Sequence, residues 1–361
     1  MEAFRQAVQS DYAEAFCPDL MIIFTNFDNF PSRWQTKEGV TGETRILRSA
    51  SAIAKAARRA PKSIALINCN PPMVYGLAAR SLTAPGGRPA LVAVDLVLRR
   101  PRSVRSWLLH PFRRFLLSRV DHFFHYFKDL RGYDSIFGVG PDRSSFVPFK
   151  ANLFERVDFQ NVPPGEYVLC LGRTLRDYDT FFEAIEKLPL PAAIARPDRH
   201  LMKRHGARFS RPLDRLPKNV RILEDDGSPE AMAEIIRSAK IVVIPILPES
   251  MAASGCSTCL NAMLFKKCII GTEGPGFSDV FENHEVLCVP PKDPVSLAQA
   301  IQDLWENDDR RESMAARGFE YAVSAGGEQD LFQRLIDRVI PWFQNEYLRL
   351  TSRKAPNAER N

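Results

Sequence analysis

The segment at residues 241–271 constrains the fold of this chain more than any other part of the sequence. It begins with an apolar run at 241–247 that is long enough for a buried strand of a parallel sheet. Apolar residues at helical spacing follow over 258–265, and a second apolar run occupies 268–270. This order of strand, loop, helix and strand predicts one βαβ crossover.

The loop inside this unit is made of small residues at the point where the helix is expected to begin. Unpaired backbone N–H groups and the positive end of the helix dipole face outward there. Gly255 would let a ligand approach the backbone, and the hydroxyls of Ser257 and Thr258 could donate hydrogen bonds. The loop therefore predicts a phosphate or diphosphate site, while ordinary capping by Ser254, Ser257 or Thr258 is the alternative.

Length and composition indicate a two-domain globular protein. The chain has 361 residues, with 45% hydrophobic and 25% charged residues. No apolar run approaches the roughly 20 residues that span a bilayer, and the first residues lack the apolar core of a signal peptide. The seven cysteines are scattered and odd in number, which favours a reducing cytoplasm. Cys256 and Cys259 form a lone CxxC without a second pair, so we expect no metal site.

Charge is divided unevenly along the chain. Residues 1–150 carry 22 Lys and Arg against 12 Asp and Glu, whereas the remainder carries 27 against 31. Residues 99–119 contain seven arginines and no acidic residue. Because the expected helix at 104–117 is also aromatic and apolar, we expect 99–119 to bind an anionic membrane surface. An ordinary amphipathic helix packed on the sheet is the alternative.

Two series of alternating strands and helices predict two doubly wound α/β domains. We expect an N-terminal domain at 1–160, a second domain at 161–328, a returning helix at 329–350 and a frayed tail at 351–361. In the first domain we expect helices at 1–18 and 44–60, and extended pieces at 136–140 and 145–148.

Polar residues follow the expected strands of the first domain. Asn68 and Asn70 follow one strand, and Asp95 follows the next. Ligands of such sheets bind at the carboxyl ends of the strands, so these residues are candidates for contact with a substrate. Asp95 could equally cap a helix or pair with Arg99.

The second half of the chain resembles the donor-binding domain of retaining GT-B glycosyltransferases of group 1 (family 4-like). Residues 171–178 read LGRTLRDY and look like the family's strand-G-R-x-x-R-D-[YW] segment. Residues 254–263 read SGCSTCLNAM and look like its helix start, S-G-x-x-x-x-x-E-A-M. Residues 289–298 read VPPKDPVSLA and look like its V-P-P-x-D-P-x-x-L-A segment. The resemblance covers roughly 165–325.

This resemblance implies a GT-B fold, with two Rossmann-like domains facing across a cleft. It implies a nucleotide-sugar donor and a glycan or lipid-linked acceptor in surface polysaccharide or glycoconjugate synthesis, without a metal or other cofactor, at the inner face of the membrane. Asp95 and Glu249 would be the catalytic residues, and Asn68 and Asn70 would lie on the acceptor side. The donor and its phosphates would be bound by Arg173, Arg176, Ser254, Gly255, Ser257, Thr258 and Asn261.

The sequence departs from the family at two positions. Many members carry two glutamates eight positions apart, where this chain has Ala253 and Asn261. A non-catalytic GT-B-like subunit or scaffold is therefore an alternative function. A nucleic-acid-binding protein that uses the arginine-rich segment is a weaker one, because stacking aromatics on a recognisable module are missing, and we expect no nucleic-acid partner.

Overall fold

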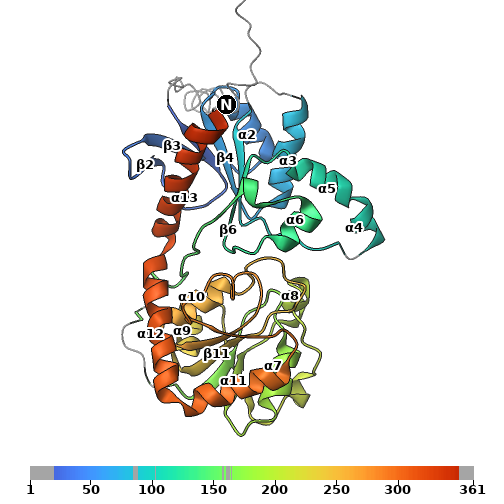
Figure 1. Cartoon of the computed structure of the whole chain (residues 1–361), viewed down its shortest axis with the longest axis vertical. Helices are drawn as coiled ribbons and strands as arrows, with labels where there is room; N and C mark the ends of the chain where they lie inside the picture. The colour runs from blue at the N-terminus through green and yellow to red at the C-terminus, as the bar shows by residue number, and fades with distance from the viewer. Residues whose placement is uncertain are drawn as a thin grey trace, which may run out of the picture. The chain divides into compact units, whose positions relative to one another are not determined.

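The computed structural model describes residues 20–83, 88–101, 103–156, 158–159, 163 and 165–348 (Figure 1). The helix expected at 1–18 and the tail at 351–361 lie outside these residues. The chain divides into two compact units. Unit 1 comprises Met1–Leu96, Leu108–Phe123 and Leu335–Asn361, and unit 2 comprises Val97–Trp107 and Phe124–Arg334. The domain limits that we expect from the sequence stay predictions.

The first sheet has seven strands in the order β2-β3-β1-β4-β5-β6-β7. Strand β1 lies parallel to both β3 and β4, β4 lies parallel to β5, and β2 runs antiparallel to β3. All residues of β1 and β5 are buried, which is typical of central parallel strands covered on both faces. The strands are β1 (Ile22–Thr25), β2 (Arg33–Gln35), β3 (Thr41–Ile46), β4 (Ser63–Asn68), β5 (Ala90–Val94), β6 (His122–His125) and β7 (Ser144–Phe146).

The helix expected at 44–60 is wrong in its first part. Residues 44–46 belong to β3, where they pair with β1, and the helix α2 covers only Ala50–Ala57. The side chain of Ser49 caps α2 by accepting a hydrogen bond from Ala52 N. The apolar spacing of Ile53 and Ala57 was therefore helical, and both are buried, but the apolar residues before Ser49 continued the strand pattern instead.

Two further expectations for the first half need correction. The single helix expected at 104–117 is interrupted, giving α4 (Val104–Leu108) and α5 (His110–Leu117). Pro111 lacks the N–H that would bond back to Trp107, so a continuous helix would lose a hydrogen bond at this point. The first two residues of the extended piece expected at 136–140 are instead the end of helix α6 (Arg131–Phe137), and Gly138 follows as its C-cap with φ of 66°.

The second sheet has six strands in the order β10-β9-β8-β11-β12-β13, and every neighbouring pair is parallel. The chain order reverses between β8 and β11, which makes this the switch point of a doubly wound sheet. The strands are β8 (Tyr167–Cys170), β9 (Ala192–Ala195), β10 (Val220–Leu223), β11 (Ala239–Ile244), β12 (Cys268–Thr272) and β13 (Leu287–Val289).

Helices cover both faces of the second sheet (Figure 1). Alternate residues of β11 point to opposite faces, so Val242 and Ile244 pack in one core cluster while Ile241 and Val243 pack in another. The first cluster lies under α9 and α10 and the second under α7 and α11. Helix α3 (Pro71–Thr83) lies between β4 and β5 in the sequence. The helices after α6 are α7 (Tyr178–Ile185), α8 (Arg199–Arg204), α9 (Pro229–Arg237), α10 (Cys256–Leu264), α11 (Pro294–Glu306), α12 (Asp308–Ala325) and α13 (Glu328–Trp342), and a π-helical turn follows at Phe343–Tyr347.

The expectation of two doubly wound α/β domains is confirmed by the two sheets. Pro341 lies inside α13, and the helix continues past it to Trp342. Among the described residues, no helix is both long enough and apolar enough to cross a membrane.

Candidate functional site

The switch point of the second sheet places two loops side by side. The loop after β8 contains residues 171–177, and the loop after β11 contains 245–255. Backbone hydrogen bonds join them, because Asp177 N donates to Pro245 O at 2.9 Å and Leu247 N donates to Leu175 O at 2.9 Å. In open α/β sheets this is where ligands bind.

Helix α10 begins at Cys256, two residues earlier than expected, without a capping side chain. Its N-cap is Gly255, in a left-handed conformation with φ of 94°. The hydroxyl of Ser254 is hydrogen bonded to Ser250 Oγ at 2.9 Å, and Ser257 Oγ accepts from Asn152 Nδ2 at 2.6 Å. The capping alternative is therefore not observed, and the positive end of the helix is left for another partner.

Arg176 lies directly beside this helix start. Its side chain is 2% exposed, and Nε donates to Leu171 O at 2.8 Å. A Cβ atom on Gly172 would lie 2.1 Å from Arg176 Nη2, and one on Gly255 would lie 2.8 Å from Nη1. Any residue with a Cβ atom at position 172 or 255 would therefore collide with the guanidinium, so both positions require glycine.

The charge of Arg176 has no counter-ion in the described part of the chain. Its Nη1 atom is buried and makes no hydrogen bond to any described residue, and burial lowers the pKa of the guanidinium. Buried charges in proteins are normally paired, because desolvation costs several kcal/mol per ion. An anion beside Gly255 would reduce this cost.

Arg173 is exposed, and in the described residues it forms no ion pair. The two carboxylates that could have paired with it are used elsewhere. Asp177 caps α7 by accepting from Thr180 N and Thr180 Oγ1, at 3.3 and 3.0 Å, and Asp179 accepts from Ser210 N at 2.8 Å. Arg173 is therefore available to a ligand, as the diphosphate role requires.

The other predicted donor-site residues differ in accessibility. Asn261 is 2% exposed, and its Oδ1 accepts from Leu153 N at 3.1 Å, so the amide is held inside unit 2 and does not face a ligand. Thr258 is half-buried in the first turn of α10, and Glu249 is half-buried in the loop at 245–255. The Asn261 position explains why an uncharged amide is tolerated there.

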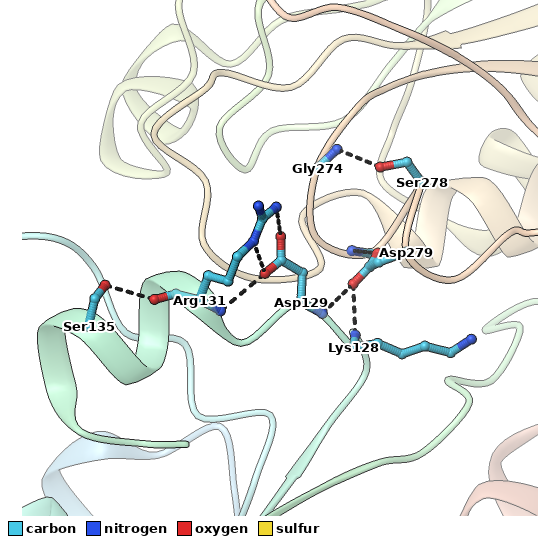
Figure 2. A network of polar contacts seen from close by, with 8 residues as sticks. Lys128, Asp129, Arg131, Ser135, Gly274, Ser278 and Asp279 are labelled. Atoms are coloured by element: carbon cyan, nitrogen blue, oxygen red, sulfur yellow. Dashed lines mark hydrogen bonds and ion pairs between the residues drawn. The ribbon is translucent and has the colours of Figure 1, made fainter. Parts of the chain in front are cut away.

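A polar network fixes a further loop of unit 2 (Figure 2). Asp279 Oδ2 accepts from the backbone N–H groups of Lys128 and Asp129 at 2.7 and 2.8 Å, and its Oδ1 accepts from Gly276 N at 2.6 Å. Arg131 donates twice to Asp129, at 2.9 and 2.6 Å, which lowers the pKa of that carboxyl group. The network holds Gly276 in the conformation that places it against Ala253.

The sequence did not single out this network. Asp279 lies in the loop after the expected strand at 268–270, and Asp129 and Arg131 lie in a segment without periodicity. The available signal was a turn pattern, Gly-Pro-Gly-Phe-Ser-Asp at 274–279, in which an acidic side chain can accept backbone hydrogen bonds.

In unit 1, Asn68 and Asn70 at the end of β4 make hydrogen bonds to other residues of the fold. Asn26 Nδ2 donates to Asn68 O at 2.9 Å, and Asn68 N donates to Asn26 Oδ1 at 2.7 Å. Asn70 Oδ1 accepts from Met73 N at 3.0 Å and thereby caps α3. The Asn70 side chain is therefore explained by its helix, whereas the acceptor role of the Asn68 side chain stays a prediction.

Asp95 directly follows β5 in a strained backbone conformation, with φ of 45°. Among the described residues it forms no ion pair and caps no helix, so neither alternative role is observed. Burial raises the pKa of its carboxyl group to about 6. Cys69, which follows the neighbouring strand, also has a positive φ of 43°. Strained residues at strand ends are typical of functional sites.

Within the part of the chain that the structure describes, no group of three or more His, Cys, Asp or Glu side chains could hold a metal ion. Arg176 and the helix dipole supply positive potential at the start of α10.

Replacement of Gly255 by alanine tests the packing of Arg176. The new methyl group would lie 2.8 Å from both Arg176 Nη1 and Ile244 Cγ2, in a left-handed backbone conformation. We expect the free energy of unfolding, measured in urea, to fall by about 2–4 kcal/mol. Gly227→Ala is the matched control, because its φ is 82° but a Cβ there has no atom within 4 Å. Equal losses in the two variants would contradict the packing of Arg176 against Gly255.

The raised pKa of Asp95 predicts a pH-dependent stability. The folded-state pKa of about 6 exceeds the unfolded value of about 3.9, so ionisation costs stability as pH rises from about 4 through about 6. We expect Asp95→Asn to gain about 1–3 kcal/mol relative to the wild type between pH 4 and pH 8, in urea unfolding at both values. A difference that does not change with pH would show that the Asp95 carboxyl group is not desolvated.

Comparison with family models identifies residues 214–321 as matching "Glycosyl transferases group 1". A comparison with curated proteins found no match. The matched segment includes α9, β11, α10, β12 and most of α12, and so contains the helix start beside Arg176.

Solved structures of similar fold include a glycosyltransferase and a synthase. HepE from Anabaena, in complex with UDP, aligns with a TM-score of 0.60 at 13% identity, over 89% of this chain and 100% of that one. A glycosyltransferase from Rickettsia africae aligns at 0.58 with 12% identity, over 84% and 86%. Sucrose-phosphate synthase from Thermosynechococcus elongatus aligns at 0.57 with 15% identity, over 92% and 89%.

These neighbours share the two parallel-sheet domains of the GT-B fold, which confirms the fold expected from the sequence. The family match falls in the half of the chain where the resemblance was strongest. The chain therefore has the GT-B fold, and its residues 214–321 match the family model of group 1 glycosyl transferases.

Proposed function

We propose that this protein moves a sugar from a nucleotide diphosphate-sugar to a hydroxyl group of a glycan or lipid-linked acceptor, with retention of configuration, in surface polysaccharide or glycoconjugate synthesis. The observation that carries the proposal is the uncapped start of α10 at Gly255, beside the buried and unpaired guanidinium of Arg176. A helix start of this kind is suited to a diphosphate.

The donor that we propose to test first is a uridine diphosphate-sugar. HepE, which has the same fold, was solved with UDP, with UDP and glucose, and with UDP-glucose. The identity of 12–13% to these structures leaves the nucleotide base of this chain's donor as a matter for experiment.

The chemistry of this transfer requires stabilisation of the departing diphosphate. As the glycosidic bond breaks, negative charge grows on the phosphate oxygens, and fixed donors aimed at them lower the barrier. In our proposal the N–H groups at the start of α10 and the Arg173 guanidinium supply these donors, with the Ser257 and Thr258 hydroxyls nearby. Arg176 is too buried to bind both phosphates, so it contributes positive potential beneath Gly255.

The acceptor side is proposed to involve Asp95. A carboxyl group with a pKa of about 6 is mostly ionised at neutral pH and can accept a hydrogen bond from a sugar hydroxyl. Asn68 is proposed to act at the same sheet edge. Glu249 remains the candidate for contact with the donor sugar, because it lies in the loop that leads to Gly255.

Nucleotide binding should depend on Arg173. We expect calorimetric titration to give micromolar affinity for one of UDP, GDP and ADP, and Arg173→Ala to weaken it about 10–100-fold through loss of charge-assisted hydrogen bonds. Arg204→Ala is a charge-matched control, because Arg204 is also exposed in unit 2 but lies on α8. If none of the three nucleotides binds, the donor-site proposal fails, and tight binding without transfer would favour the scaffold alternative.

We further propose that the protein works on the cytoplasmic face of a membrane. Of the eleven exposed large hydrophobic residues in the described chain, six lie between positions 104 and 115. Four of these six residues lie in unit 1 and form what we call the α5 patch. They are Leu108, Leu109, Phe112 and Phe115, which are 76%, 42%, 57% and 49% exposed.

Charge complementarity favours an anionic lipid surface as the partner of the α5 patch. Arg113, Arg114 and Arg119 lie on or next to α5, and Arg119 lies over the Phe115 ring at 5.9 Å. The alternative of a helix packed fully on the sheet explains Leu116 and Leu117, which are buried, but not the exposed aromatic residues. Aromatic, apolar and basic residues together are typical of an interfacial helix. An acceptor anchored in the same membrane would then be within reach.

Vesicle binding tests the α5 patch. We expect the wild type to sediment with phosphatidylglycerol vesicles but not with phosphatidylcholine vesicles. Arg113→Ser with Arg114→Ser should weaken binding about tenfold or more, since each basic residue near the surface contributes about 1 kcal/mol. Arg204→Ser with Arg215→Ser removes the same charge from unit 2 and should change little. Pelleting that is insensitive to the Arg113 and Arg114 changes would exclude this surface.

A further inference from the structure

Unit 1 contains a cavity of about 320 Å³ at the amino ends of its parallel strands. It lies between α2, α3 and the beginning of β5, and Leu91 in the first half of β5 lines it. Asp95, in contrast, follows the carboxyl end of β5. The cavity is therefore at the edge of the sheet opposite to the one proposed for the acceptor, and the inference drawn from it does not rest on the proposed function.

The described residues that line this cavity include cations and hydroxyl groups but no aspartate or glutamate. Helices α2 and α3 and the start of β5 contribute four cations. The cations are Lys55, Arg58, Arg80 and Arg88, with hydroxyls from Ser51 and Ser81 among the lining groups.

Arg88 is held in place by a carboxylate. Its Nη1 and Nη2 donate to Asp121 Oδ2 and Oδ1 at 2.6 and 2.7 Å, which raises the pKa of the guanidinium. Asp121 also accepts from Leu91 N at 2.8 Å, so the pair is tied to the first strand residues beside the cavity. This geometry fixes the position of Arg88 before any ligand arrives.

The other three cations have no such partner. In the described residues Lys55, Arg58 and Arg80 form no ion pair, and Arg80 donates only to Gly76 O, at 3.0 Å. Cations in the last turn of a helix are common, because they interact with the helix dipole, and this accounts for Lys55 and Arg80 singly. The helix dipole does not explain why cations from three elements line one cavity. Leu77, Pro89 and Leu91 supply apolar lining to the same cavity.

We propose that this cavity is a binding site for a phosphate-bearing ligand, distinct from the donor site of unit 2. Three cations without an ion pair among the described residues, together with the fixed Arg88, can bind the negative charge of a phosphate group. The cavity volume is at the lower end of the range for small-molecule sites. The phosphate could belong to a soluble compound or to a lipid head group, and the two sources share the same recognition chemistry.

Amide hydrogen exchange, measured with and without pyrophosphate, tests whether this probe binds at the cavity of unit 1. We expect pyrophosphate to slow exchange in the peptides that cover 50–58 and 77–83. This protection should persist in Arg173→Ala, which alters only the proposed donor site. Absence of slowed exchange in both segments would overturn the proposal, whatever happens at α10.

Two neighbouring arginines provide a matched pair of variants. Arg58 lines the cavity and Arg59 does not, although both are exposed at the end of α2. We expect Lys55→Ser with Arg58→Ser to weaken pyrophosphate binding about tenfold or more in calorimetry, and Arg59→Ser to change it less than about twofold. Equal effects of Arg58→Ser and Arg59→Ser would show diffuse surface attraction and overturn the site.

A soluble short-chain lipid distinguishes the two sources without involving the α5 patch. Dihexanoyl phosphatidic acid that binds more tightly than pyrophosphate, and is lost in the Lys55 and Arg58 variant, would indicate a lipid head group. Binding of pyrophosphate alone would indicate a soluble phosphate compound. Binding of neither probe would overturn the proposal.

Discussion

The arrangement of unit 2 around its switch point depends on one buried guanidinium. Arg176 requires glycine at positions 172 and 255, because a methyl group at either would collide with its nitrogens. Gly255 in turn takes a left-handed conformation, and no side chain caps the helix there. The backbone N–H groups in the first turn of α10 therefore donate to no capping side chain. Burial of one charge therefore explains the two glycines and the helix start without a capping side chain.

Sequence patterns predicted the parts of this fold whose periodicity is unambiguous. The βαβ unit around α10 was predictable because its strands are continuous apolar runs buried on both faces. Strand β3 was not, since Thr44, Arg45 and Ile46 lie near the end of a sheet where Ile46 is 41% exposed, and a half-exposed strand carries no apolar run. Pairing with β1, which is a long-range interaction, decided its structure.

The candidate site was predictable in its residue types but not in its accessibility. Arg173 is exposed and Gly255 is the N-cap of α10, whereas Asn261 is held in the packing of unit 2 by Leu153 N. The loop at 151–156 that supplies this N–H is remote in sequence, so no local pattern could have indicated it. The same applies to Asp279, whose partners are about 150 residues away.

The two uncharged positions in the donor loop change the electrostatic character of the site. A glutamate at 253 would add negative charge to the donor loop, whereas the side chain at 261 is held inside unit 2 by Leu153 N. With Ala253 and Asn261, in contrast, the described residues offer Arg176 no carboxylate partner, and Ala253 serves as the packing surface for Gly276. In our proposal, attraction for phosphate is then less compensated than it would be with a carboxylate in the loop at position 253, and other groups recognise the sugar. Glu249, in the same loop, is the nearest carboxylate in sequence that could supply it.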